Sequence, residues 1–312
     1  MMVYPRIYVL PALLLLALSY VTPADSQTLR RSAQTVAPVY EGFQRQPDGT
    51  IDLIFGYFNR NWEEEIHVPI GPDNHFTPQG PDVGQPTYFY PRRSRFVFRV
   101  KVPGDFGNSE VIWTLRTRGE TLRAYGTLRP EYELDDVAIM ANFGGAGPSG
   151  FHPSIVGNKR PTLTVVGDRT RSAAVGTPIS LVATATDDGK PSPRSMGALS
   201  GVSGNLGEVR VRGGGNVAPS SATGLRLSWL IYRGPKNVSW NPAQIKTWED
   251  LRDGGQSPWS NGFKTPDPPP GNEWRTEITF QTPGTYVLRC LAHDGGLQRY
   301  EDVTFVVSPP VQ

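Results

Sequence analysis

Cysteine is almost missing from this chain: Cys290 is the one cysteine among 312 residues. A disulfide within the chain is therefore excluded. Cys290 also lies far from the N-terminus, so no cysteine stands where a lipid could be attached beside a cleaved leader. The fold must be stabilised by the packing of its apolar side chains.

Long apolar runs are also scarce. The run from Ile7 to Val21 follows a positively charged start and precedes the small residues of Ala24-Asp-Ser26. This order is typical of a secretory signal peptide, and the run is shorter than the roughly 20 residues of a membrane span. We expect removal of residues 1–26, which leaves no transmembrane span and a secreted or periplasmic protein. An uncleaved N-terminal anchor is the alternative.

Known catalytic signatures are missing as well. The sequence has no G-x-S-x-G and no H-E-x-x-H, and its histidines fall in separate segments without metal-ligand spacing. The histidines are His67, His75, His152 and His293. A glycosidase needs only two placed carboxylates, so that alternative stays open. We nevertheless expect the protein not to be an enzyme.

One glycine run has the spacing of a dinucleotide-binding loop. Gly144 to Gly150 contains G-x-G-x-x-G, but Pro148 within it and Pro153 after it stand where such a loop needs a helix. The sequence therefore predicts a Gly/Pro-rich linker over residues 137–160, acting as a hinge, and no cofactor.

Charge of either sign is sparse, with a net charge of +2 and 19% charged residues. Arg95, Arg99 and Lys101 share one face of an expected strand, and Arg116 and Arg118 lie on a neighbour. A basic surface of this kind could bind an anionic polymer. Residues 36–136 nevertheless contain more acidic than basic side chains, so we expect a solvated sheet face and no nucleic-acid partner.

What the chain has in abundance is turn residues, 34 glycines and 30 prolines. Between them lie short segments of alternating apolar and polar residues, of which 95–102 is the clearest. Further strands are expected at 50–58 and 65–70, and a hairpin at 111–128. The sequence predicts an all-β protein whose first domain, residues 36–136, is a β-sandwich.

Part of this first domain resembles a recurrent module of secreted bacterial proteins of uncharacterised role. The resemblance lies in residues 55–61, 68–74, 84–87 and 111–115. It implies an extracellular β module and carries no catalytic residues.

Residues 161–308 contain the strand series of an immunoglobulin-like sandwich, with strands at 161–166, 178–189 and 225–232. Residues 279–307, with Pro-Gly-Thr-Tyr before a strand that ends in Asp-Gly, resemble the closing strands of polycystic-kidney-disease (PKD) and cadherin-like modules. In that frame Trp229 packs in the core against Tyr286, Leu288, Cys290 and Ala292. Cys290 is then a buried structural residue.

Two long insertions interrupt this second domain, at 190–224 and 234–273. Asn241 followed by Pro242 is typical of a helix start, with Ile245, Trp248 and Leu251 on one stripe. The sequence therefore predicts one short helix here. Residues 248–259, with 286–302, again resemble secreted bacterial proteins of unassigned role.

Three acidic residues are a candidate calcium site. Loops of an immunoglobulin-like sandwich that emerge at the same end should bring Asp187, Asp188 and Asp294 together. Ca²⁺ prefers six to eight oxygen ligands, which carboxylates and carbonyls supply. The alternative is that these Asp residues only form turns, since Asp commonly hydrogen-bonds its own backbone beside a glycine.

Tryptophans in the second insertion are a candidate ligand surface. Trp240, Trp259 and Trp274 could bind a carbohydrate or a protein, because aromatic rings with a polar edge are frequent anchors. The alternative is a satellite core, particularly for Trp248.

Together these features predict two β-sandwich domains, the second immunoglobulin-like, in an exported bacterial-type protein. We expect a binding or structural module of the cell envelope or extracellular space, with a protein or polysaccharide as partner. A carbohydrate-binding accessory protein that uses the Trp-rich insertion is the alternative.

Overall fold

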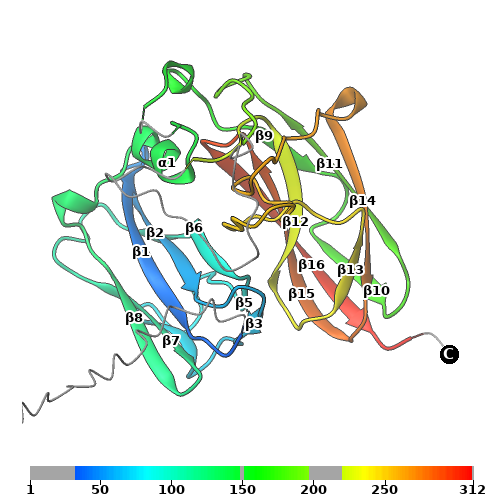
Figure 1. Ribbon diagram of the computed structural model, residues 1–312. Helices are drawn as coiled ribbons and strands as arrows, with labels where there is room; N and C mark the ends of the chain where they lie inside the picture. The colour runs from blue at the N-terminus through cyan, green and yellow to red at the C-terminus, as the bar shows by residue number, and fades with distance from the viewer. Residues whose placement is uncertain (1–31, 148–150, 197–219, 311–312) are drawn as a thin grey trace, which may run out of the picture.

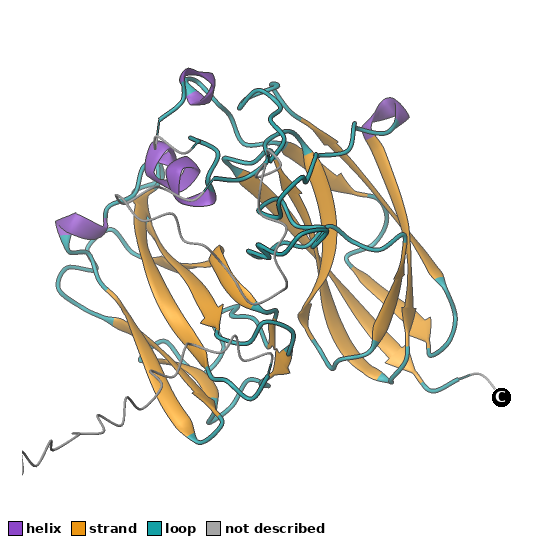
Figure 2. Ribbon diagram, viewed as in Figure 1, coloured by secondary structure: helices purple, strands orange, loops and turns teal. Residues whose placement is uncertain are grey.

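The computed structural model describes residues 32–147, 151–196 and 220–310. The expected signal peptide, residues 1–26, and much of the first insertion lie outside the described residues. Strands form two groups that lie side by side, the N-terminal group in blue to green and the C-terminal group mainly in yellow to red (Figure 1). Helical segments are few and short (Figure 2). The predicted all-β fold of two β-sandwiches is confirmed.

The first sandwich packs a sheet ordered β1-β2-β6 against a sheet ordered β4-β7-β8, with a small β3-β5 sheet beside them. Its strands are β1 (Val36–Arg45), β2 (Ile51–Asn59), β3 (Ile66–His67), β4 (Asn74–Thr77), β5 (Tyr88–Phe89), β6 (Arg92–Val102), β7 (Val111–Thr117) and β8 (Glu120–Gly126). The hairpin of β7 and β8 and the alternation of β6 agree with the sequence prediction. Phe55, Phe98 and Trp113 meet in its core, with ring centroids 5.0 to 6.2 Å apart.

The second sandwich consists of sheets ordered β10-β16-β15-β12 and β13-β14-β11-β9. Its strands are β9 (Thr162–Val165), β10 (Thr170–Ala174), β11 (Ile179–Thr186), β12 (Arg226–Arg233), β13 (Val238–Asn241), β14 (Glu273–Phe280), β15 (Gly284–His293) and β16 (Gln298–Ser308). Pairing is antiparallel except between β10 and β16, which run parallel. This is the immunoglobulin-like arrangement that the sequence predicted.

The predicted core of this sandwich is also confirmed. Trp229 on β12 is the cross-strand neighbour of Cys290 on β15, and both are buried. Burial raises the pKa of the Cys290 thiol. Cys290 is therefore an unreactive apolar residue of the core.

The expected linker is not a free hinge. It contains the only α-helix of the described residues, α1 (Asp136–Phe143), which begins where the Asp135 carboxylate accepts from Ala138 N and ends at Gly144, at φ 88°. Ile139, Met140 and Phe143 of this helix are buried. A helix therefore precedes Gly144, because Gly supplies the left-handed conformation of a helix C-terminus, and residues 148–150 of the glycine run lie outside the described residues.

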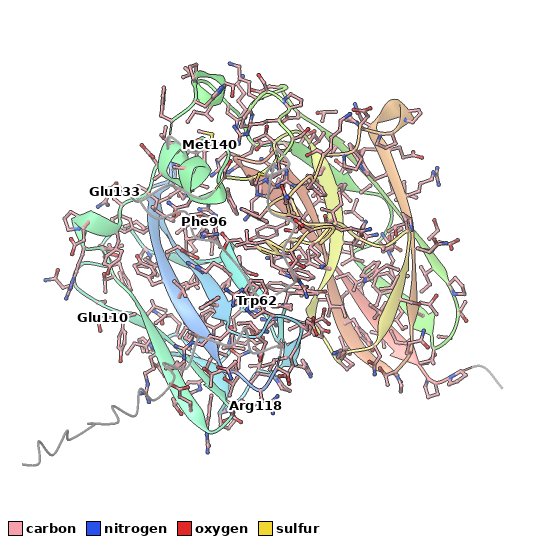
Figure 3. All side chains as sticks on the ribbon, viewed as in Figure 1. Trp62, Phe96, Glu110, Arg118, Glu133 and Met140 are labelled. Carbon is pink, nitrogen blue, oxygen red and sulfur yellow. The ribbon has the colours of Figure 1, made fainter. Side chains whose placement is uncertain are left out.

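Close backbone contact attaches the same segment to the second sandwich. A Cβ atom on Gly145 would lie 2.6 Å from the carbonyl oxygen of Gly295, and one on Gly296 would lie 2.8 Å from the Met140 side chain. Figure 3 shows Met140 close to Phe96 of β6 in the first sandwich. The segment thus packs against both domains, which is why it cannot act as the predicted hinge.

The helix expected to begin at Asn241 is absent from the described residues that follow it. Asn241 instead ends β13 and pairs with Glu277 of β14. The residues after Asn241 form turns and loops, and Leu251 of the expected apolar stripe is exposed. Among the described residues the only α-helix lies between the domains, and the second insertion contains only a short 3-10 helix, η3 (Pro270–Asn272).

Candidate functional site

The three candidate calcium ligands lie at one end of the second sandwich, but they do not form a cluster. Asp188 accepts from Lys159 N and Lys190 N, and Asp187 accepts from Gly189 N. The described residues contain no group of three or more His, Cys, Asp or Glu side chains that could hold a metal ion. Among the described residues these carboxylates therefore do not form such a group, and calcium binding stays a prediction.

Asp294 is turned into the protein and is fully buried. Its Oδ1 accepts from Gly296 N at 2.5 Å and Leu297 N at 2.7 Å, while Oδ2 lies 3.2 Å from Asn158 Nδ2. Burial, with the neighbouring Asp187 charge, raises the pKa of Asp294 to about 7. The carboxyl group fixes the β15–β16 turn in the manner of an Asx turn.

The three candidate tryptophans do not share an exposed surface. Trp259 is only 5% exposed and belongs to the cluster formed with α1, while Trp240 and Trp274 are half-buried and pack against the core of the second sandwich. Trp248 stacks on Tyr90 of the first domain with ring centroids 4.9 Å apart. The insertion therefore uses these rings mainly for internal packing.

The basic face of the first domain is paired with acidic groups. Arg99 lies 3.3 Å from Asp52, and Lys101 lies 3.3 Å from Asp48. The remaining pairs are Arg95 with Glu249, Arg116 with Asp73, and Arg118 with Glu64. Because each basic group has an acidic partner, the face offers little net positive potential to a polyanion.

The outer face of the β12-β15-β16 sheet is buried against the first domain. Arg289 is nearly fully buried and binds Asp302 through Nε and Nη2, both at 2.8 Å. Its Nη1 donates to Val97 O at 2.5 Å, and Gln298 Nε2 donates to Phe96 O at 2.8 Å. Phe96 and Val97 belong to β6, which lies at the edge of its own sheet. The second domain thus satisfies carbonyl groups of an open sheet edge.

Tyrosine side chains cross between the two cores. Tyr232 of β12 packs in the core of the first sandwich, and its hydroxyl donates to Gly84 O at 2.5 Å. In the opposite direction Tyr88 and Tyr90 pack in the core of the second sandwich, and Ile231 N donates to the Tyr90 hydroxyl at 2.9 Å. The two sandwiches are therefore joined by buried, hydrogen-bonded contacts and not only by the chain.

A cavity of about 60 Å³ lies within this interface. One wall is β6, the opposite wall is the outer face of β12, β15 and β16, and residues 246–247 and 258–259 complete the lining with Phe143. On the second wall Arg226, His293 and Gln298 are successive cross-strand neighbours. Burial lowers the pKa of Arg226 to about 10, and burial together with the Arg226 charge lowers the pKa of His293 well below its usual value.

Sequence reasoning missed this interface. The sequence feature that could have predicted the interface is the presence of apolar and aromatic residues on both faces of 226–233. A strand with one face in solvent should instead alternate apolar and polar residues. Arg289 and His293 on the outward face of β15 gave no comparable signal, because charged residues there are ordinary on a solvated sheet.

Comparisons with known proteins gave distant structural likenesses only. No family model matches the chain, and no curated protein matches it. Among solved structures, the PKD domain of an M14-like peptidase from Thermoplasmatales archaeon SCGC AB-540-F20 is 13% identical with a TM-score of 0.20, over 49% of this chain and 96% of that domain.

Two further solved structures are similar at the same level. Domains 4 and 5 of the S-layer protein SbsC are 8% identical with a TM-score of 0.21, over 64% of this chain and 65% of that one. The fibronectin(III)-like modules of Clostridium thermocellum CbhA are 9% identical with a TM-score of 0.22, over 88% and 95%. At these values none of the three bears on function.

The fold and the interface define the class: an all-β protein of two β-sandwiches, the second immunoglobulin-like, with an extensively bonded interface. Within the described ranges no helix has the length and apolarity needed to cross a membrane.

Proposed function

We propose that this chain is an exported, non-enzymatic structural or binding module of the cell envelope or extracellular space, in which both sandwiches act as one rigid unit. The observation that supports this most is the interface around Arg289. A buried guanidinium that binds a carboxylate at two points and a carbonyl of the other domain fixes their relative orientation. A unit of fixed shape suits a protein that bears load or presents a surface to an envelope protein or polysaccharide.

The export part of the proposal is supported by the apolar run and small residues of 1–26. Fractionation of cells that produce the full chain tests it. The protein is expected in the envelope or the medium, and complete retention in the cytoplasm would contradict the proposal.

Small-angle scattering of the mature protein tests rigidity. A profile that fits the docked arrangement is expected for the wild type and for Arg275→Met, which removes an exposed charge from β14. Arg289→Met should broaden the distance distribution. Independent motion of the two sandwiches in the wild type would refute the rigid-unit proposal.

The carbohydrate-binding alternative has no specific support. It requires several exposed rings on one surface, whereas Trp259 is buried and Trp240 and Trp274 pack inward.

A further inference from the structure

The cavity between the two sandwiches has an unusual lining: its arginine and lysine side chains bring positive charge, and no Asp or Glu of the described residues contributes to it. Three of the basic groups are paired with carboxylates that point in from outside the lining. Arg95 binds Glu249, Lys246 binds Asp250, and Arg289 binds Asp302.

Arg226 is different, because it has no carboxylate partner among the described residues. It is 5% exposed, and its Nη1 reaches only two backbone carbonyls, Ala222 O at 3.3 Å and Gly224 O at 3.5 Å. Asp294 is near enough to raise the pKa of Arg226, but it is not in ion-pair contact, and its oxygens already accept from other groups. A buried charge without a counter-ion is strongly unfavourable.

Two neutral donors in the same lining also lack acceptors. His293 Nδ1 accepts from Gly295 N at 2.8 Å, which places the proton of the neutral ring on Nε2. This Nε2 and the indole Nε1 of Trp259 are buried and have no hydrogen-bond partner within the described structure. Buried polar groups are rarely left unpaired, so each requires an explanation.

We propose that the cavity binds a small anion of the size of a carboxylate group, held by Arg226 together with the Nε–H groups of His293 and Trp259. Arg226 lacks a carboxylate partner, and the Nε–H groups of His293 and Trp259 lack acceptors, so one anion supplies both the charge and the acceptors. Water accepts hydrogen bonds but does not neutralise Arg226. The cavity volume of about 60 Å³ exceeds the roughly 10 to 15 Å³ that one water molecule needs, so a small anion such as formate or acetate has room there. This site is independent of the proposed structural function.

Thermal unfolding of the mature protein tests the proposal, with sodium formate, acetate or 2-naphthoate as probes at equal ionic strength. A ligand at 100 times its Kd shifts the folding equilibrium by about 100-fold. Formate and acetate are therefore expected to raise Tm, whereas 2-naphthoate, which has the same charge but is too large, should not. Equal shifts with all three salts would show a general salt effect and overturn the proposal.

Substitutions locate the effect. Arg226→Met should abolish the preference for small anions, whereas Arg275→Met, which removes an exposed arginine of the same domain, should preserve it. Trp259→Phe keeps an aromatic ring, although a smaller one, and removes the Nε1–H, so it should weaken binding by about tenfold, as expected for one hydrogen bond to a charged group. Equal responses of the wild type and these cavity variants would mean that the cavity holds only water.

A direct measurement covers the case in which Arg226→Met does not fold. In ¹⁵N NMR spectra of the wild type, the indole N–H signal of Trp259, assigned by its loss in Trp259→Phe, is expected to move on addition of formate. An unmoved signal at formate concentrations that saturate the Tm shift would overturn the proposed site.

Discussion

Replacement of Arg289 by Met is the most direct test of the interface. The Arg289 side chain is 6% exposed and Asp302 is 34% exposed, so the change leaves a partly buried carboxylate without its partner. Breaking a buried pair costs about 3 to 5 kcal/mol, and the partial exposure of Asp302 favours the lower end. Loss of the donor to Val97 O adds about 1 kcal/mol. The free energy of unfolding should therefore fall by about 3 to 4 kcal/mol.

Arg289 also lies between two tyrosine rings, with its guanidinium carbon 3.6 Å from the Tyr232 centroid and 3.7 Å from the Tyr300 centroid. Methionine retains part of this packing, so the variant isolates the charge and its hydrogen bonds. Because Tyr232 belongs to the core of the first sandwich, loss of the Arg289 guanidinium should weaken the coupling between the two domains. Unfolding of the variant should separate into two transitions.

Urea unfolding followed by tryptophan fluorescence and circular dichroism measures both effects. Arg275→Met is the matched control, because the Arg275 side chain is 66% exposed and its pair with Glu273 should contribute less than about 1 kcal/mol. A double-mutant cycle of Arg289 and Asp302 gives their coupling energy. A loss below 1 kcal/mol for Arg289→Met, with both probes still coincident, would refute the reasoning.

Four further predictions concern single sites. Native Cys290 should react with thiol reagents only slowly, since it is buried and its pKa is raised; fast labelling without denaturant would contradict its core position. Trp229→Ala should lower the unfolding free energy by about 3 to 5 kcal/mol through the cavity it leaves, and a change under 1 kcal/mol in urea titrations would count against its core role. N-terminal sequencing of the exported protein should begin near Gln27, and an intact Met1 would favour an uncleaved anchor. Finally, Asp294 should make stability depend on pH. The pKa of Asp294 is about 7 in the folded protein and 3.8 in the unfolded chain, so between these values the folded state binds one more proton. The free energy of unfolding should therefore fall, by up to about 4 kcal/mol, as the pH rises from 4 through 7.

Asp294→Asn checks the sign of the last effect. The amide stays neutral and its oxygen can accept from Gly296 N and Leu297 N, so this variant should lose much of the pH dependence. At pH 8 it should be at least as stable as the wild type. Urea titrations at pH 5 and pH 8 measure the free energy of unfolding of both proteins. The same pH dependence in Asp294→Asn as in the wild type would show that the carboxyl group is already ionised in the folded protein at low pH.

The local pattern of the sequence predicted part of the strands, among them β2, β6 and the β7–β8 hairpin, but not β1, β4 or β10. Alternation at 95–102 predicted β6, because a strand has a period of two and one face must be buried. The resemblance to an immunoglobulin-like sandwich predicted that Trp229 and Cys290 share a core. The same local reasoning was wrong for Asn241. Its neighbours favour a helix cap, but pairing with Glu277 places it in a sheet.

Only the tertiary structure decided what the polar residues do. Asp294 was a candidate calcium ligand in the sequence, and it is instead buried and bonded within its own turn. Arg226 and His293 were inconspicuous, yet docking of the first sandwich removes them from water and gathers them around a cavity. The physical reason is that strand periodicity is a short-range property of the chain, whereas burial of a sheet's outer face depends on a second domain whose position no local pattern specifies.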